Sequence, residues 1–177
     1  GSITGIGSAV LTGQGATTGF DGTSANVSGN FTDITSLSGT GTLTGDDVAS
    51  TWALDGTPTY SDGTRTLDIA GFASLQGNTA ADTFNVTAAS TFNLLGGAGA
   101  DVFTINAALT GTVSGEAGSD TLQGTQIGST TLTASTAADG FSGTTTGVTG
   151  FSGINVLNGS GTLTGRDVAS TWSVDGA

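Results

Sequence analysis

A long internal repeat constrains the fold of this chain more than any other feature of its 177 residues. Residues 39–56 read GTGTLTGDDVASTWALDG, and residues 159–176 read GSGTLTGRDVASTWSVDG, with only four differences. Upstream of these segments, Phe31 corresponds to Phe151 at the same offset of 120 residues. Repeats of this kind indicate units that share their hydrophobic faces with neighbouring copies. We therefore expect an excerpt of a longer array whose unit is about 120 residues long.

A shorter, 19-residue period runs through the middle of the unit. Its polar column is made of aspartates: Asp82, Asp101, Asp120 and Asp139. A first apolar column follows two residues after them: Phe84, Phe103, Leu122 and Phe141. A second apolar column has the same spacing: Leu75, Leu94, Val113, Leu132 and Phe151. Residues 83–86 and 102–105 alternate apolar and polar side chains, which predicts strands that bury one face.

These periods predict an all-β fold, a parallel β-solenoid with about 19–20 residues per coil that runs continuously over residues 1–177. A helical repeat is disfavoured because glycine, with 32 residues, is a poor helix former and strong helix formers are few. One coil cannot bury its own inward face, so coils must stack and share a core. The glycine column Gly77, Gly96, Gly115 and Gly153 is expected to form turns with positive φ. The long unit then corresponds to about six coils.

The composition excludes several classes of function. The chain has 14 acidic residues and two basic ones, so it lacks the basic face that a nucleic-acid partner requires. It contains no cysteine and no histidine, which excludes thiol nucleophiles, imidazole acid–base chemistry and zinc sites of the usual kind. No apolar run approaches the roughly 20 residues of a membrane-spanning helix, so no membrane insertion is expected. Because the acids form a ladder rather than a cleft, we predict that the chain is not an enzyme.

Two segments resemble the nonapeptide GGxGxDxUx of the RTX family. Residues 96–104 read GGAGADVFT, and residues 115–123 read GEAGSDTLQ, in which Glu116 replaces the second glycine. The resemblance implies a Ca²⁺ ladder whose ligands are Asp101, Asp120, Asp82 and Asp139. This chain departs from the family because each 19-residue period holds one such motif, whereas each coil of the family holds two. The alternative is that each aspartate accepts a hydrogen bond from an amide of its own turn and points outward; both interpretations stay open here.

Two further motifs suggest ligand binding. The segment DVASTW at 47–52 and 167–172 places tryptophan beside polar residues, as a glycan platform would, although core packing of Trp52 and Trp172 is the preferred interpretation. Thr-x-Thr triplets such as those at 42–44 and 131–133 are similar to those of ice-binding solenoids, but they do not follow the 19-residue period. An ice- or glycan-binding solenoid is kept as a further, remote alternative on the basis of these two motifs.

As a whole the chain resembles the β-solenoid repeat regions of large bacterial exoproteins, namely filamentous-haemagglutinin-like adhesins and RTX-repeat-containing surface proteins. The resemblance implies a right-handed parallel β-helix at the cell surface or outside the cell. It also implies a non-enzymatic structural role as a stalk, adhesin shaft or self-assembling fibre, with an RTX-like Ca²⁺-binding folding or secretion module as the alternative. Neither end shows a capping helix, and exposed strand edges promote further pairing. We therefore expect head-to-tail self-association, while the sequence identifies no receptor or glycan.

Overall fold

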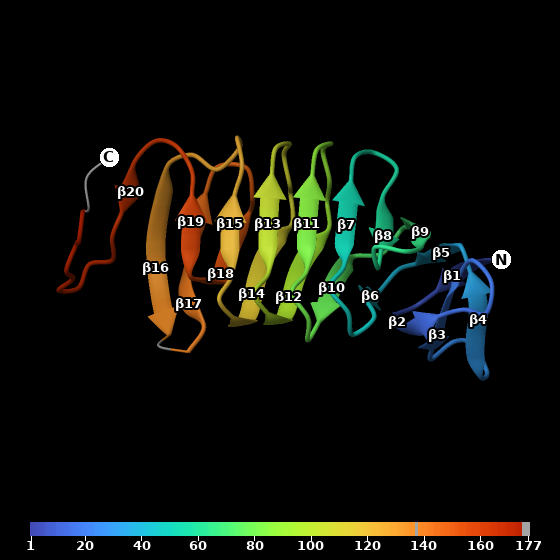
Figure 1. The fold of residues 1–177 in the computed structure, drawn as a ribbon. Coiled ribbons are helices and arrows are strands. Elements are labelled where there is room, and N and C mark those ends of the chain that lie inside the picture. Colours follow the sequence, from blue (N-terminus) through green and yellow to red (C-terminus); the bar gives the residue numbers. More distant parts are fainter. Residues whose placement is uncertain (137, 175–177) are drawn as a thin grey trace.

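The structure is a computed structural model that describes residues 1–136 and 138–174, and it consists of strands joined by loops and turns. Figure 1 shows an elongated stack of strands with the two chain ends at opposite ends of the molecule. Over the described ranges there is no helix, and hence none of the length and apolar character needed to cross a membrane. The expected all-β class is confirmed.

One sheet, called sheet A, has nine strands. In spatial order they are β1 (Ser2–Ile6), β5 (Ser36–Gly39), β9 (Thr66–Ala70), β8 (Thr59–Ser61), β7 (Thr51–Leu54), β11 (Thr83–Val86), β13 (Val102–Ile105), β15 (Thr121–Gln123) and β19 (Val156–Asn158). Neighbouring strands are parallel except for the pairs β7–β8 and β8–β9, which are antiparallel. The short β8 strand therefore interrupts an otherwise parallel stack.

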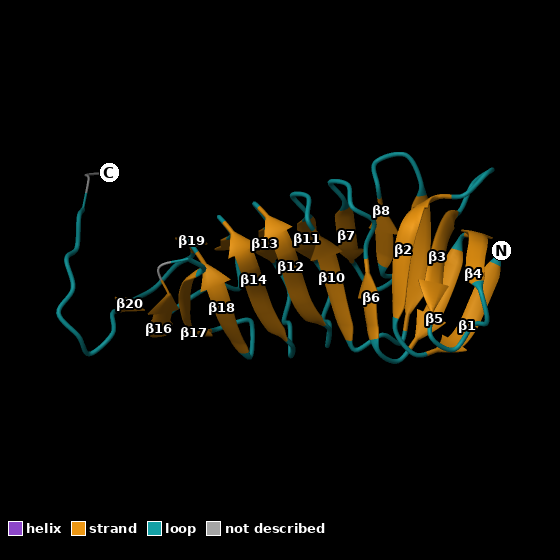
Figure 2. Ribbon diagram, turned by 90° about the horizontal axis from the view of Figure 1, so that it is seen from below, coloured by secondary structure: helices purple, strands orange, loops and turns teal. Residues whose placement is uncertain are grey.

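The other sheet, called sheet B, has eleven strands and packs beside sheet A along the stack (Figure 2). In spatial order they are β20 (Leu163–Thr164), β16 (Thr130–Thr136), β17 (Gly140–Thr145), β18 (Gly150–Ile154), β14 (Thr112–Gly118), β12 (Asn93–Gly99), β10 (Ser74–Asn78), β6 (Thr42–Thr44), β2 (Ala9–Gln14), β3 (Phe20–Ser24) and β4 (Asn30–Ile34). The pairs β2–β3, β3–β4, β16–β17 and β17–β18 are antiparallel. The arrangement of stacked parallel and mixed sheets is compatible with a β-solenoid.

Residues 74–123, in the middle of the molecule, follow the predicted 19-residue period. We call each successive pair of a sheet B strand and a sheet A strand a rung: β6–β7, β10–β11, β12–β13, β14–β15 and β18–β19. In sheet A the paired apolar residues are Trp52, Phe84, Phe103, Leu122 and Leu157. In sheet B they are Leu43, Leu75, Leu94, Val113 and Phe151. All of these residues except the partly buried Leu157 belong to the buried core. The rings of Phe84 and Phe103 stack there, with their centroids 4.9 Å apart.

The predicted period fails after Gln123 because a hairpin is inserted there. Strands β16 and β17, which carry Leu132 and Phe141, lie between β15 and β18 in the sequence. In sheet B they form an antiparallel pair beyond β18, which itself pairs directly with β14. Phe141 is 43% exposed, and Leu132 is only partly buried. The prediction of Phe141 in the first apolar column is wrong, since Leu157 pairs with Leu122 instead. Leu132 is likewise displaced from the second column, where Phe151 pairs directly with Val113.

Candidate functional site

Three of the four predicted aspartates form a buried row, which we call the aspartate ladder: Asp82, Asp101 and Asp120. Each one lies directly before a strand of sheet A, so equal rungs superpose their side chains. The Oδ1 atom of Asp101 accepts a hydrogen bond from the backbone N–H of Asp82 over 2.8 Å. The Oδ1 atom of Asp120 accepts one from the N–H of Asp101 over 2.9 Å. The side chains therefore continue the pairing of the strands by one residue.

Different residues terminate the ladder at its two ends. At one end, Oδ1 of Asp82 accepts hydrogen bonds from the backbone N–H, over 2.8 Å, and the hydroxyl of Ser50. At the other end, the backbone N–H of Asp120 donates to Oδ1 of Asn155 over 2.9 Å. Sequence reasoning missed Asn155 because its offset from Asp120 is 35 and does not match the 19-residue period. An Asn in the rung after an inserted hairpin is the signal that could have identified it.

The ladder differs from both predicted roles of the aspartates. The prediction of an outward-pointing side chain that caps its own turn is wrong for these three residues, because they are buried and bind the preceding rung. The physical reason is that a buried backbone N–H at the start of a strand must find an acceptor. The aspartate carboxylate is this acceptor, because regular strand pairing has not yet begun at that residue.

The second carboxylate oxygen of each ladder residue faces a glycine of its own rung. A Cβ atom at Gly77, Gly96 or Gly115 would overlap with Oδ2 of Asp82, Asp101 or Asp120 respectively. The expectation that the glycine column provides turns with positive φ is confirmed at Gly153, whose φ is 65°. It is wrong for Gly77, Gly96 and Gly115, since positive φ occurs instead at Gly97, Gly99 and Gly118. These three positions require glycine because the aspartate carboxylate occupies the space that a side chain there would need. All three Oδ2 atoms are buried and have no hydrogen-bond partner.

The RTX-like motif has a positive φ at its second position. Gly97 has φ of 103° there, and Glu116, its partner on the next rung, has φ of 67°. A non-glycine residue in this region is uncommon. Glu116 thus has a positive φ, as Gly97 does, although it replaces the second glycine of the motif.

Burial shifts the acidity of the ladder. Desolvation raises the pKa of Asp101 to about 7 from its ordinary value of 3.8, and the hydrogen bond from the N–H of Asp82 opposes the shift. The neighbouring carboxylates Asp120 and Asp82 raise this pKa further by repulsion. The pKa values of Asp82 and Asp120 are also raised, mainly by desolvation. Stacked buried carboxylates of equal sign thus favour their protonated forms.

Asp139 does not join the ladder, and its predicted place there is wrong. It lies at the turn of the inserted β16–β17 hairpin and is half-buried. Its N–H donates to Oγ1 of Thr136 over 2.9 Å, and its carboxylate accepts from the same hydroxyl over 3.1 Å. Its place one 19-residue period after Asp120 is a coincidence of hairpin length.

The predicted calcium ligands do not converge on a common point. Over residues 1–136 and 138–174, no group of three or more Asp, Glu, His or Cys side chains is arranged to hold a metal ion. In the ladder, Oδ1 of each aspartate is engaged by a backbone N–H, and Oδ2 faces glycine. Calcium binding at Asp101 and Asp120 therefore stays a prediction of the sequence motif alone.

The two tryptophan motifs lie in different surroundings. Trp52 is fully buried in sheet A, where its ring stacks on Phe84 with centroids 5.6 Å apart, as the core interpretation predicts. Trp172 is 56% exposed, so the same prediction is wrong for the second copy. The final two residues of that copy, 175 and 176, lie outside the described residues.

Comparisons of this chain with protein-family models, with curated proteins and with solved structures found no match.

Proposed function

We propose that this chain is a non-enzymatic structural module of a large secreted or bacterial cell-surface repetitive protein. It forms part of a stalk, adhesin shaft or self-assembling extracellular fibre, folded as a right-handed parallel β-helix with inserted hairpins. The proposal follows the resemblance to repetitive exoproteins and rests on one structural observation: the 120-residue sequence repeat is also a repeat of strand pairing.

The same residue pairs recur in both copies at an offset of 119–121 residues. Leu11–Gly22 recurs as Leu132–Gly143, Gly22–Phe31 recurs as Gly143–Phe151, and Ile3–Leu37 recurs as Leu122–Leu157. The hairpin β2–β3 thus has its counterpart in β16–β17, and each hairpin pairs next with a parallel strand, β6 or β20. The recurrence of the same strand pairs favours a module that stacks on further copies of itself along one axis.

Each unit advances the stack by the same amount in both sheets. Seven strand-to-strand steps separate β5 from its counterpart β19 in sheet A, and seven separate β6 from β20 in sheet B. At about 4.8 Å per step, one unit lengthens the stack by about 34 Å. These seven steps include strands of the inserted hairpins, so they are not a count of coils. Equal advance in both sheets permits indefinite extension without distortion.

The ends of the stack support head-to-tail self-association. Sheet A ends in β1 and β19, and sheet B ends in β4 and β20, so each end of the described chain presents one unpaired strand of each sheet. Unpaired edges accept further strands, and a contact between unlike ends propagates rather than closes. Outside the buried aspartate ladder, acidic residues still greatly outnumber the two basic ones, and this excess of negative charge opposes lateral association.

Small-angle scattering of chains that carry one, two and three 120-residue units tests the proposal. We expect the maximum dimension to increase by about 34 Å per added unit at constant cross-section. Analytical ultracentrifugation of the 177-residue chain over a wide concentration range tests end-to-end association, which should give a series of open-ended oligomers. A compact particle whose cross-section grows with unit number would contradict the rod. A monomer at every concentration would contradict only the self-association.

A further inference from the structure

The outward side of sheet A carries no charged side chain over five neighbouring strands, β7, β11, β13, β15 and β19. Every second residue of these strands points away from the core, and strand pairing aligns these residues in two columns. The first column is Thr51, Thr83, Val102, Thr121 and Val156. The second column is Ala53, Asn85, Thr104, Gln123 and Asn158. We call this surface the sheet A face.

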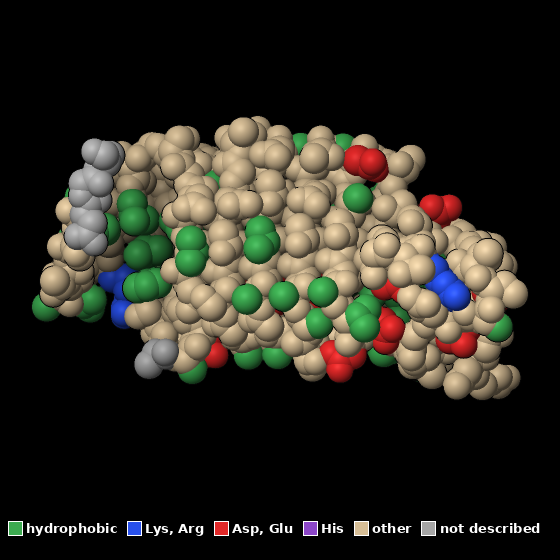
Figure 3. Space-filling model, viewed as in Figure 1, with side chains coloured by type: hydrophobic (Ala, Val, Ile, Leu, Met, Phe, Trp, Pro, Cys, Tyr) green, Lys and Arg blue, Asp and Glu red, His purple; other side chains and the backbone are tan. Residues whose placement is uncertain are grey.

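Acidic side chains lie around the sheet A face rather than on it. Figure 3 shows no acidic or basic side chain over the middle of these strands, whereas acidic side chains gather below them and towards the N-terminal end. Among all the described strands of sheet A, Asp68 of β9 is the one charged residue. Because the chain has 14 acidic residues against two basic ones, a side without carboxylates is an exception on its surface.

The outer side of sheet B differs, because a carboxylate lies across it. Gln76 in β10 and Glu116 in β14 are separated by β12, and Nε2 of Gln76 donates to Oε2 of Glu116 over 3.3 Å. A partner that packed on this side would bury that carboxylate, which is costly without a basic group to pair with it. Of the two described sheets, sheet A therefore offers the side that an acidic partner can approach closely.

The sheet A face is also flat. Figure 1 shows its strands side by side with almost the same direction. Neighbouring strands usually twist by about 20–25°, and flat sheets of many strands are typically stabilised by stacking or by side-chain ladders. A ladder contact is present on the face, where Nε2 of Gln123 donates to Oγ1 of Thr104 over 3.1 Å. The face is thus a regular surface with about 4.8 Å between rungs, which a second copy matches at every rung.

We propose that the sheet A face packs against the sheet A face of a second copy of this chain, so that two stacks lie side by side. The proposal goes beyond the end-to-end association above, because this contact runs along the flank and does not use the ends. Paired flat sheets interdigitate their outward side chains, and columns that contain Asn and Gln add to this packing. The contact uses the same surface on both copies and therefore closes after two, while carboxylates on the other sides oppose further lateral growth.

The size of the face determines how strongly two copies pair. Five strands at about 4.8 Å, each with four residues of about 3.3 Å, cover roughly 24 by 13 Å, or about 300 Å² per copy. Stable interfaces bury about 800 Å² per partner, so the 177-residue chain should pair weakly. A chain with two 120-residue units offers the face twice and should pair at least about tenfold more tightly. Salt screens the repulsion between acidic flanks, so pairing should strengthen between about 0.02 and about 0.5 M NaCl.

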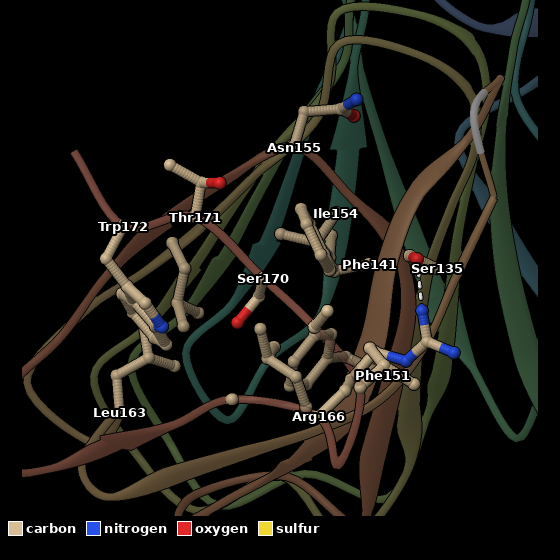
Figure 4. A pocket seen from close by; sticks show the side chains of 15 residues that line it. Ser135, Phe141, Phe151, Ile154, Asn155, Leu163, Arg166, Ser170, Thr171 and Trp172 are labelled. Atoms are coloured by element: carbon tan, nitrogen blue, oxygen red, sulfur yellow. Dashed lines mark hydrogen bonds between the residues drawn. The ribbon is translucent and has the colours of Figure 1, made fainter.

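Large apolar side chains gather elsewhere, at a pocket of about 470 Å³ near the C-terminal end of the chain (Figure 4). Its lining includes Phe141, Phe151 and Trp172, and Trp172 is 56% exposed. None of the lining residues belongs to the two columns of the sheet A face. Pairing through the face should therefore leave the emission of Trp172 unchanged, which separates this contact from association through the pocket.

Sedimentation equilibrium and small-angle scattering of the 177-residue chain test the proposal together. We expect a monomer–dimer equilibrium in which the mass per unit length doubles at high concentration and returns to that of one rod on dilution. Asn85→Asp places a carboxylate on the face with little change of shape, and it should weaken pairing at least about tenfold. Thr44→Asp is the matched control, because it adds the same charge to the outer side of sheet B, and it should change pairing by less than about twofold. Neither variant should change Tm by more than about 2 °C.

Gln123→Glu, on another strand of the face, is a second variant of nearly unchanged shape and should weaken pairing to the same extent. No pairing of the 177-residue chain or of a two-unit chain up to about 1 mM would overturn the proposal. Equal weakening by Asn85→Asp and Thr44→Asp would overturn it too.

The scattering data also distinguish the lateral contact from the other routes of association. Oligomers that lengthen the rod at constant mass per unit length, and that Asn85→Asp leaves unchanged, would assign self-association to the ends and overturn the lateral contact. Pairing that shifts the emission of Trp172 and survives Asn85→Asp would assign it to the pocket, with the same consequence. Pairing without lengthening would support the sheet A face and contradict the end-to-end association.

Discussion

The backbone N–H of Asp82 donates a 2.8 Å hydrogen bond to Oδ1 of Asp101, its equivalent on the next rung. Both residues are buried. The backbone carbonyl of Asp82 accepts from the N–H of Val102 over 2.9 Å, so the side chain and the main chain together join the two rungs. The ladder thus combines a structural hydrogen bond with a carboxylate that burial makes costly to ionise.

The first prediction concerns the pH dependence of stability. Burial raises the pKa of Asp101 to about 7, above its ordinary value of 3.8, so the folded state holds the proton more tightly than the unfolded state. This contribution to the free energy of unfolding is complete below about pH 4 and is lost as the pH rises towards 7. The raised pKa values of Asp82 and Asp120 act in the same direction. We expect urea unfolding to have a higher midpoint at pH 5 than at pH 8.

Two aspartates outside the ladder have lowered pKa values and give stability the opposite pH dependence. The pKa of Asp33 is lowered, first by the hydroxyl of Thr17, and that of Asp55 is lowered, first by the N–H of Thr57. Their stabilising effect is present above the ordinary pKa and declines as the pH falls through their lowered values. Stability should therefore be greatest in mildly acidic solution. A midpoint that rises from pH 5 to pH 8 would contradict the assignment of the ladder.

The second prediction separates the acceptor from the charge in the ladder. Asp101→Asn keeps Oδ1 for the N–H of Asp82 and removes the ionisable group, as Asn155 already does for Asp120. At pH 8 this variant should be about as stable as the parent chain or more stable, with a flatter pH profile. Asp101→Ala leaves the buried N–H of Asp82 unpaired and should cost about 1–3 kcal/mol. Equal destabilisation by both variants in chemical denaturation would show that the hydrogen bond is not the stabilising element.

The third prediction concerns calcium. The Oδ1 atoms of Asp101 and Asp120 accept backbone hydrogen bonds, and their Oδ2 atoms face Gly96 and Gly115, so a bound ion would have to displace these contacts. We expect calorimetric titration with Ca²⁺ to give no binding heat, and we expect the same Tm in chelator as in millimolar Ca²⁺. A chelator-dependent loss of the β signal in circular dichroism, suppressed by Asp101→Asn, would instead support the RTX-like alternative.

The fourth prediction compares two phenylalanines from the same sequence column. Phe103 is fully buried, and its ring lies 4.9 Å from that of Phe84, so Phe103→Ala should cost about 3–5 kcal/mol. Phe141 is 43% exposed, so Phe141→Ala should change the free energy of unfolding by no more than about 0.5–1 kcal/mol. Chemical denaturation of the two variants tests the hairpin insertion directly. A similarly large loss of stability in both variants would instead support an uninterrupted 19-residue register that includes Phe141.

The sequence predicts the rungs well where every rung has the same length. Between Ser74 and Gln123 the 19-residue period is also the spacing of paired residues, so the columns through Phe103 and Leu94 are read correctly. Beyond Gln123 the inserted hairpin adds two strands, and Leu132 and Phe141 fit the period without sharing its structure. Periodicity reports spacing along the chain and does not distinguish a rung from a hairpin of similar length.

The ladder illustrates a second limit of sequence reasoning. A column of aspartates is visible in the sequence, and three of its four members lie in one buried row. Whether a carboxylate points outward to a turn or inward to the next rung depends on which backbone N–H groups the strand pairing leaves unsatisfied. That depends on strand boundaries, such as the start of β13 at Val102, which are the least predictable part of an element.

The last prediction tests why glycine precedes each ladder residue by five positions. At Gly96 a Cβ would overlap with Oδ2 of Asp101 and lie 2.7 Å from the carbonyl oxygen of Gly115, so neither the side chain nor the neighbouring strand leaves room for it. Gly96→Ala should therefore destabilise the chain by about 1–3 kcal/mol, as overpacking of a core does. Gly150→Ala is the matched control in sheet B, because its Cβ would meet only the carbonyl oxygen of Gly143 at 3.6 Å. We expect this control to be neutral or slightly stabilising in thermal and urea unfolding, since alanine reduces the entropy of the unfolded chain. If Gly96→Ala is tolerated as well as the control, the carboxylate does not occupy the space above Gly96, and the inward orientation of the ladder is wrong.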